Sequence, residues 1–451
     1  MESLNRRGLR NGLLMVLMWA LLVPVTYGHG EIAQMAGIRM RTIHWFDTEI
    51  QPTQVKVNDI VTVRGKFMVS GHWPDYVAKP EEWVFLNIGV PGPVFVRLDA
   101  TINGMPQYQS TAFKRGEFYE YEVKLKARVP GEWHVHPLIN VWEAGPIAGP
   151  ARFVQIGGDK ADFVNTVTLM DGELVDVENY GLSSMWSIHL LWVLVGLLWV
   201  GYWFRRLPVM MYRYVMVKEH GELEAERRLI SIQDIVVSAT FVVAIIGVTL
   251  GLMVWSFDRW SITIPLQTGK VEAPVIPLPE SQQQVDVKVN RAQFDLPSRR
   301  LDMALEVTNR STEPVRVGKF VTGYARFINP AVLEDMKHDR YDPVAPTGLS
   351  SDVEWIEPGQ SRLINVTLAD ALWGEHRLTD IVAEPDLRFA GLMFFYSADG
   401  QRHVREIGAR MTPNFLPGYV PVNRHGGHLA LESRGSVGWG GRSPDHAESL
   451  A

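Results

Sequence analysis

The sequence predicts a mainly β protein in which two β domains, sandwiches or small barrels, flank a pair of transmembrane helices. Two observations predict this class. Short stretches of alternating apolar and polar residues are separated by Gly, Pro and Asn turns, and two longer apolar runs contain no Asp, Glu, Lys or Arg. A chain of 451 residues is longer than the chains that usually fold around a single hydrophobic core, so we expect two or three domains.

The N-terminus resembles a secretory signal peptide over residues 1–28. An apolar run, residues 13–28, follows a short polar stretch with three arginines and ends in small residues at Gly28. The alternative is an uncleaved anchor helix, but the run is shorter than the roughly 20 residues that span a bilayer. We therefore expect cleavage after Gly28 and a mature chain that begins at His29.

The first β domain is placed at residues 29–183. Over residues 119–127, aromatic and aliphatic side chains alternate with Glu and Lys, and residues 61–64 alternate in the same way. Successive strand residues point to opposite faces, so each stretch offers one apolar face to a core.

Two transmembrane helices are predicted within residues 184–256, over the uncharged runs 185–204 and 235–256. The loop between them carries an excess of Lys and Arg, which places it on the cytoplasmic side. Both β domains then face outward, in agreement with the signal peptide. His189 lies near the outer end of the first run, and we expect a structural role for it.

The second β domain is placed at residues 257–420. Residues 285–289 and 301–307 alternate as strands do, and residues 394–400 end in an Asp-Gly turn. Residues 421–451 are rich in Gly, Ser and His and have little to bury, which is typical of a flexible tail. We expect the histidines of this tail to be solvated rather than to bind metal: His425, His428 and His446.

Composition excludes several classes of function. The formal net charge of −6 gives no support to a nucleic-acid partner. The chain has no cysteine, which excludes disulfides, thiol nucleophiles, iron–sulfur clusters, zinc–thiolate sites and blue-copper centres. Any metal must therefore be bound by His, carboxylate or backbone groups.

The stretch GEWHVHPLINV places His134 and His136 one residue apart on a predicted strand. Both imidazoles would lie on one face, with Trp133 and Val135 on the other. A new N-terminus at His29 would add an amine and a ring nitrogen, and an all-nitrogen site suits copper. Each feature alone is more often structural or accidental, so the copper hypothesis depends on their combination in a cysteine-free, exported domain.

Several motifs resemble the B subunit of the particulate methane and ammonia monooxygenases, a copper membrane monooxygenase family that also includes short-alkane enzymes. The similarity runs in order from His29 to about Pro417. Its motifs are HGEIAQMAGIRMRTIHWFD (29–47), PGEWHVHPLINVWEAGPIAGP (130–150), GYWFRR (201–206), WSITIPLQTG (260–269) and DLRFAGLMFFYSADGQRHVREI (386–407).

The resemblance implies two extracytoplasmic cupredoxin-like β-barrels joined by two transmembrane helices, assembled with subunits A and C as a trimer of heterotrimers. It implies a copper bound by His29, His134 and His136. Glu31 of the HGE motif would contact a ligand rather than the copper itself. In some members the histidine that matches His44 binds a further copper. Met68 stands at the position aligned with its partner, so we expect no second copper here.

His403 is a further candidate, in the stretch GQRHVREI after the Asp399-Gly400 turn. On a strand over residues 401–407, His403 and Arg405 share one face, and the resemblance puts this segment near the copper. His403 would then be a neighbour or an extra ligand of the site. The alternative is a solvated strand histidine.

The expected function is that of the copper-binding B subunit of a membrane-bound monooxygenase that hydroxylates methane or a short alkane with O2. The alternatives are the B subunit of an ammonia monooxygenase, a membrane-tethered periplasmic copper-delivery protein, and a scaffold with a vestigial site. Scattered methionines disfavour delivery. The expected location is the cell membrane, inner or intracytoplasmic, with both β domains on the periplasmic side; whether the copper is catalytic or structural stays open.

Overall fold

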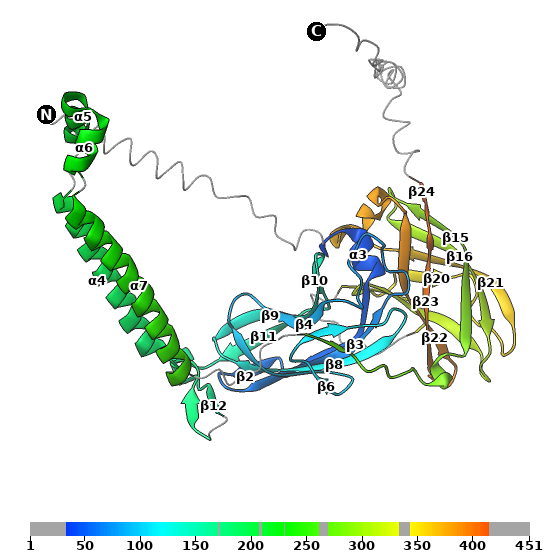
Figure 1. Cartoon of the computed structure of the whole chain (residues 1–451). Coiled ribbons are helices and arrows are strands. Elements are labelled where there is room, and N and C mark those ends of the chain that lie inside the picture. Colours follow the sequence, from blue (N-terminus) through cyan, green and yellow to red (C-terminus); the bar gives the residue numbers. More distant parts are fainter. Residues whose placement is uncertain are drawn as a thin grey trace, which may run out of the picture. The chain divides into compact units, whose positions relative to one another are not determined.

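The computed structural model describes residues 33–169, 172–206, 210–229, 231–260, 269–332 and 343–414 (Figure 1). The predicted signal peptide, His29, Glu31 and the tail from residue 421 with its three histidines lie outside the described residues. The chain divides into two compact units, one formed by residues 1–161 and 267–451 and the other by residues 162–266. The first unit holds both β domains.

The N-terminal β domain consists of two packed sheets. One has the strand order β1-β3-β8-β5-β6, and the other has the order β14-β7-β4-β9-β11-β2, with β10 paired to β9. The strands of the first sheet are β1 (Ile43–Gln51), β3 (Ile60–Val69), β8 (Phe118–Ala127), β5 (Phe95–Ile102) and β6 (Met105–Pro106). Those of the second are β14 (Lys270–Glu272), β7 (Ser110–Ala112), β4 (Val84–Gly89), β9 (Gly131–Val141), β11 (Arg152–Gly157), β2 (Gln54–Lys56) and β10 (Gly145–Ala148).

The predicted alternation over residues 119–127 is confirmed, because every second side chain of β8 is buried between the sheets. Trp45 of β1 lies 5.4 Å from the ring of Phe67 on β3, measured between ring centroids. A Cβ atom on Gly149 would lie 2.9 Å from Trp45 and 2.7 Å from Pro137 of β9. The two sheets therefore pack tightly around an aromatic core.

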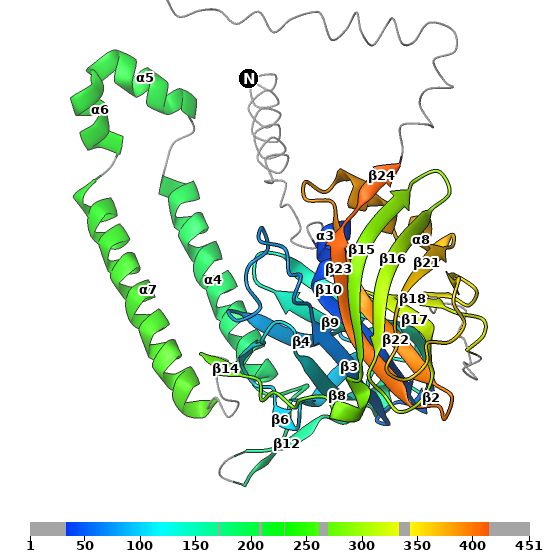
Figure 2. The same cartoon turned by 90° about the vertical axis from the view of Figure 1, so that its right-hand side faces the viewer.

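The C-terminal β domain also pairs two sheets, with strand orders β20-β21-β16-β15-β24 and β19-β18-β17-β22-β23 (Figure 2). The strands are β15 (Val285–Asp295), β16 (Arg300–Asn309), β17 (Val315–Thr322), β18 (Ala325–Ile328), β19 (Val344–Ala345), β20 (Leu349–Ser351), β21 (Ser361–Ala369), β22 (Arg388–Ser397), β23 (Arg402–Arg410) and β24 (Thr412–Asn414). As predicted, the Asp-Gly turn joins a hairpin, that of β22 and β23.

Short helices close this domain: η2 (Glu280–Gln282), α8 (Leu372–Glu375) and η3 (Leu378–Ala383). Trp373 of α8 is fully buried, and its ring centroid lies 5.1 Å from those of both Phe294 and Phe327. Because those two rings come from β15 and β18, one in each sheet, Trp373 ties the sheets together.

The two β domains contact each other directly. An apolar cluster combines Phe46 and Met68 of the first domain with residues of the second, among them Leu392 and Phe394. Helix α3 (Ala36–Arg41) packs on β22 and η3, and Trp45 N donates to the Gly323 carbonyl oxygen at 2.7 Å. After the helical segment, β14 returns to the first domain and pairs in parallel with β7.

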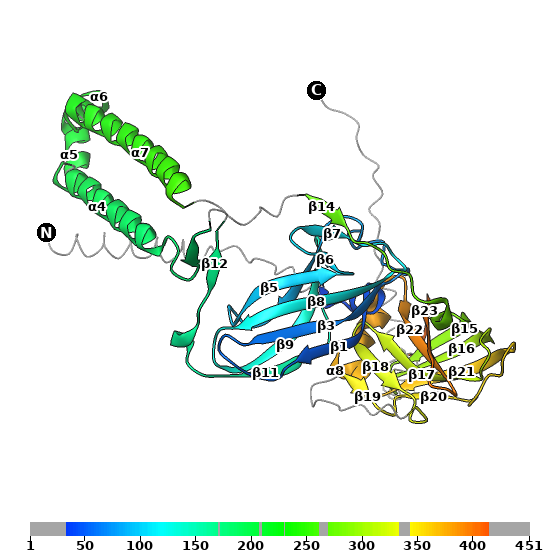
Figure 3. The ribbon, with the colours of Figure 1, turned by 90° about the horizontal axis from the view of Figure 1, so that it is seen from below.

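The second unit contains two helices long and apolar enough to cross a membrane, α4 (Leu182–Arg206) and α7 (Ile232–Arg259) (Figure 3). They extend the predicted spans by a few residues at each end. The helices contact each other through the stacked rings of Trp199 and Phe241, whose centroids are 4.1 Å apart. Shorter elements complete the described part of this region: η1 (Lys160–Asp162), β12 (Thr166–Thr168), β13 (Leu174–Asp176), α5 (Met210–His220) and α6 (Glu222–Leu229).

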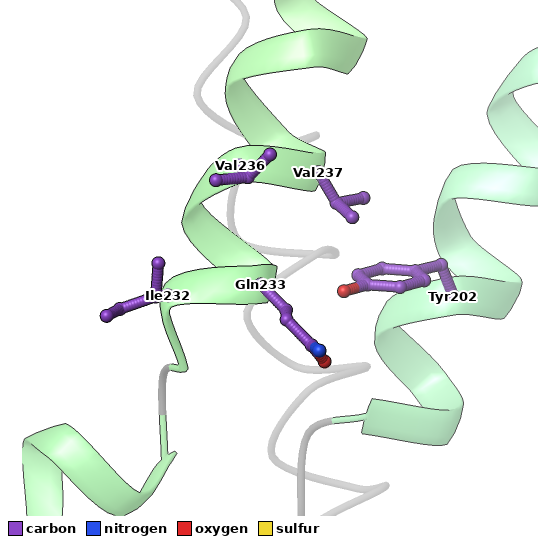
Figure 4. A pocket seen from close by; sticks show the side chains of 5 residues that line it. All are labelled: Tyr202, Ile232, Gln233, Val236 and Val237. Carbon is purple, nitrogen blue, oxygen red and sulfur yellow. The ribbon is translucent and has the colours of Figure 1, made fainter.

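A cavity of about 520 Å³ opens between α4 and α7 where α7 begins (Figure 4). Tyr202 lines it, and its hydroxyl donates to Asp234 Oδ1 at 2.7 Å. Asp234 is buried and forms a reciprocal capping box with Ser231 at the start of α7. This carboxylate therefore has a structural role, because it caps α7 and accepts a hydrogen bond from Tyr202 of α4.

The predicted fold class is confirmed: the chain is mainly β, with two sheet-rich domains and two apolar helices.

Candidate metal centre

Strand β9 places His134 and His136 on one face of the second sheet. Val135 and Ile139 of the same strand are fully buried in the core, so the two histidines, which alternate with them along the strand, lie on the opposite face. The centroids of the two imidazole rings are 5.7 Å apart. Because β9 pairs with β4 on one side and β11 on the other, a central strand fixes the backbone beneath both rings.

His136 sits in a recess that a glycine leaves open. Gly89 of β4 is its cross-strand partner, and a Cβ atom there would lie 2.4 Å from His136 Cε1 and Nε2. The Nδ1 atom of His136 is buried and has no hydrogen-bond partner of ordinary geometry. Burial lowers the pKa of His136, and the neighbouring His134 lowers that pKa further, while the backbone at Pro137 acts in the opposite direction without cancelling the shift. A neutral imidazole is the form that binds a metal.

His134 is exposed and is oriented by an aromatic neighbour. The Phe153 ring of β11, the cross-strand partner of His134, lies 4.9 Å from its imidazole, centroid to centroid. The two histidines therefore differ, since one is recessed over a glycine and the other is accessible from solvent.

His134 and His136 fit as two of the ligands of a metal ion whose other ligands come from another part of the chain. Within the described ranges, no group of three His, Asp or Glu side chains is arranged to hold a metal ion. The pair offers two imidazoles on a rigid strand, one with a buried nitrogen that has no hydrogen-bond partner of ordinary geometry. Both features are those expected of ligands, and a complete site would take its remaining donors from outside the described part of the chain.

His403 lies on β23, as the predicted strand requires, but the structure does not bring it together with the histidine pair. Its ring is fully buried, so the alternative of a solvated histidine is wrong. Burial lowers the pKa of His403, against the opposing effects of the Ser281 backbone and Asp399. Arg405, on the same face, donates from Nε to the Val285 carbonyl oxygen at 2.6 Å. This face is turned into the C-terminal domain.

The opposite face of β23 meets the N-terminal domain and carries a residue that the sequence analysis did not single out. Glu406 accepts hydrogen bonds from Ser70 Oγ and from the Gly71 amide, and its Oε1 lies 3.8 Å from His44 Nε2. The Nδ1 atom of His44 accepts a hydrogen bond from the Gly323 amide at 3.2 Å. His44 is thus held by residues of the second domain, and no local pattern marks these partners.

His72 completes this group. Its ring packs against Gly408 of β23, where a Cβ atom would lie 2.5 Å from His72 Cδ2. Burial lowers the pKa of His72, although Glu406 acts in the opposite direction. Burial alone would raise the pKa of Glu406, but His44 and the donors Ser70 and Gly71 outweigh it and hold that pKa below its ordinary value. Glu406 is therefore an ionised carboxylate at neutral pH.

Comparison with known proteins identifies relatives over most of the chain. Residues 30–415 match the family of monooxygenase B-subunit proteins. The chain is 40% identical over 398 residues to the "Particulate methane monooxygenase alpha subunit" of Methylococcus capsulatus (strain ATCC 33009 / NCIMB 11132 / Bath), covering 88% of this chain and 94% of that protein.

Similar solved structures include the cupredoxin domain of amoB from Nitrosocaldus yellowstonii, at 15% identity and a TM-score of 0.20, covering 26% of this chain and 89% of that one. A protein of unknown function from Porphyromonas gingivalis W83 is 10% identical, with a TM-score of 0.17, and covers 83% of this chain and 99% of that one.

Proposed function

Because the chain belongs to the family of monooxygenase B-subunit proteins, we propose that it is the copper-binding subunit of a membrane-bound monooxygenase. The observation that carries the copper assignment is the geometry of His136, a recessed imidazole beside a second histidine, with a buried Nδ1 that has no hydrogen-bond partner of ordinary geometry. A side chain buried in this way costs free energy unless it gains a partner. A metal ion would be that partner.

The proposed ligands are His134 and His136 from β9, together with the amine and ring of His29 at the mature N-terminus. Glu31 would contact one of these ligands rather than the metal. Copper, when bound, supplies a redox-active centre of the kind that oxygen chemistry requires. The chain's own contribution is to hold the imidazoles in place, through the β9 backbone, Phe153 and the space above Gly89.

The proposed substrate is methane or a short alkane, oxidised with O2 in a complex with subunits A and C, arranged as a trimer of heterotrimers. This choice is supported by the relative at 40% identity, which is named a particulate methane monooxygenase. Ammonia is the alternative substrate. Oxidation assays on membranes that contain the whole complex distinguish them, since methane turnover without hydroxylamine formation supports the first substrate and the reverse supports the second.

The proposed location is the cell membrane, with α4 and α7 spanning it and both β domains on the periplasmic side. The cationic loop between the two helices supports this orientation, because basic loops stay in the cytoplasm. Protease protection in sealed inside-out and right-side-out vesicles would measure it directly.

Replacement of both His134 and His136 by Ala tests the metal assignment. We expect the purified complex to lose one copper per chain. The matched control is the triple replacement of His425, His428 and His446 by Ala, which should leave the copper content unchanged. Equal copper loss in both variants, or no loss in the first while the complex stays assembled, would refute the assignment.

A further inference from the structure

A polar cavity of about 330 Å³ lies on the N-terminal β domain, apart from the histidine pair. It forms beside β4, where the described part of β7 pairs with that strand at Val84 and no further. The next stretch of the β4 edge is left free for side chains from β5, β9 and the segment before β7. Six side chains matter to its chemistry: Phe85, Asn87, Arg97, Gln107, Gln109 and Asn140.

The side chains that line this cavity carry positive charge and no negative charge. Its lining carries one guanidinium, that of Arg97, with carboxamides and no carboxylate. Within the described residues, Arg97 makes one hydrogen bond, from Nη1 to the Leu86 carbonyl oxygen at 3.3 Å, and no ion pair. An arginine side chain has five N–H donors. The bond to Leu86 therefore anchors the guanidinium at the strand edge and leaves most of its donors available.

The Gln107 side chain, which also lines the cavity, is held in place. Gln107 is buried, its Oε1 accepts from Thr111 Oγ1, and its Nε2 donates to the Met105 carbonyl oxygen at 3.3 Å. Some other arginines of this domain are paired with carboxylates: Arg64, for example, donates from Nε and Nη2 to Glu49 Oε2 at 3.0 and 2.7 Å. Arg97 differs from Arg64 because a polar cavity, rather than a carboxylate, lies beside it.

We propose that this cavity binds a small oxyanion, a carboxylate or an inorganic anion of similar size, between Arg97 and the carboxamides. The guanidinium fork matches the two oxygens of a carboxylate, and the amide groups of Asn87 and Asn140 supply further donors. The cavity volume lies at the lower end of the range for ligand sites and leaves ample room for an anion of this size. Because Arg97 is exposed, we expect millimolar rather than micromolar affinity.

This site is distinct from the metal centre. Asn140 shares a strand and a face with His136 and lies four residues further along β9, roughly 13 Å at the usual rise of a strand. An anion beside Asn140 is too far away to coordinate a metal held by His136. Arg97 is not among the residues that contact the histidine pair, so Arg97→Gln is expected to leave the copper content unchanged. Asn87 lies two residues from Gly89 along β4, so copper content and anion binding are measured separately for each variant.

The test uses the full chain in its purified complex. Formate and acetate in one series, and phosphate and sulfate in another, are titrated at constant ionic strength, with calorimetry and thermal unfolding as the readouts. We expect saturable binding in at least one series. Arg97→Gln should weaken it at least tenfold while the copper content stays at the wild-type value.

Two variants complete the design. Asn87→Asp is nearly isosteric and places a negative charge in the cavity, so it should also weaken binding, and it replaces the first variant if Arg97→Gln does not fold. Arg64→Gln is the matched control and should bind as the wild type does. The absence of saturable binding in the wild type, or wild-type affinity in both Arg97→Gln and Asn87→Asp, would overturn the proposal.

Discussion

The Nε2 atom of His44 lies 3.8 Å from Oε1 of Glu406, and this contact joins the first strand of one β domain to the last hairpin of the other. Glu406 also accepts hydrogen bonds from Ser70 Oγ and the Gly71 amide. A nearly buried carboxylate that serves several donors across an interface fixes the relative placement of the two domains.

Glu406→Gln should lower the stability of the interface. The substitution keeps the shape of the side chain but removes the charge that His44 and the donors Ser70 and Gly71 favour, at a cost of about 2 kcal/mol. Denaturant or thermal unfolding of the solubilised protein measures the loss. Glu120→Gln is the control, because Glu120 is an exposed partner of Lys66, and it should change the unfolding midpoint very little.

Acidification should weaken the same interface in two steps. Burial depresses the pKa of His72 below its ordinary value of 6.5, so the unfolded chain takes up a proton first as the pH falls below about 6.5, and stability declines from there. The pKa of Glu406 in the folded protein lies below its ordinary value of 4.5. The contribution of Glu406 to the stability of the fold is therefore complete above about pH 4.5 and is lost as the pH falls through the pKa of the folded state. His72→Gln should remove the first step alone, and an unchanged pH profile of unfolding in that variant would contradict this assignment.

Gly89→Ala should reduce copper retention. The added methyl group would lie 2.4 Å from the His136 ring, which must then move away from its position beside His134. We expect an affinity for copper about tenfold weaker, the lower end of the range for supporting residues. Gly157→Ala on β11 is the control, because the nearest atom to its Cβ would be 3.9 Å away. Equal copper retention in the two alanine variants would show that the recess is not needed.

His403→Gln should leave the copper content and the copper EPR spectrum of the complex unchanged. The ring is buried on the face of β23 that is turned to Ser281 and the C-terminal domain, away from the face that carries Glu406. The substitution should lower the unfolding midpoint instead, because it alters a packed core. An altered EPR spectrum would restore His403 as a neighbour of the metal.

Features with a local pattern were predictable from the sequence. The alternation along β8, the hairpin at Asp399-Gly400 and the uncharged spans of α4 and α7 each depend on neighbours in the chain. The shared face of His134 and His136 follows from the two-residue period of a strand.

Features that join distant segments were not predictable. Nothing near His44 indicates that Glu406 will meet it, and nothing in residues 270–272 indicates that β14 will pair with β7 of the first domain. The period of β23 puts His403 and Arg405 on one face, but only tertiary packing decides that this face turns inward. The space that Gly89 leaves for His136 is likewise set by a cross-strand pairing.

Pulsed EPR of the copper in the purified complex, prepared with isotopically labelled histidine, tests the central claim most directly. The account predicts hyperfine coupling to histidine nitrogens, and it predicts that His136→Ala removes one imidazole from the spectrum while the His425, His428 and His446 replacements leave it unchanged. A copper spectrum without histidine coupling, or one that is identical in the wild type and in His136→Ala, would contradict the assignment of this metal to the strand β9 pair.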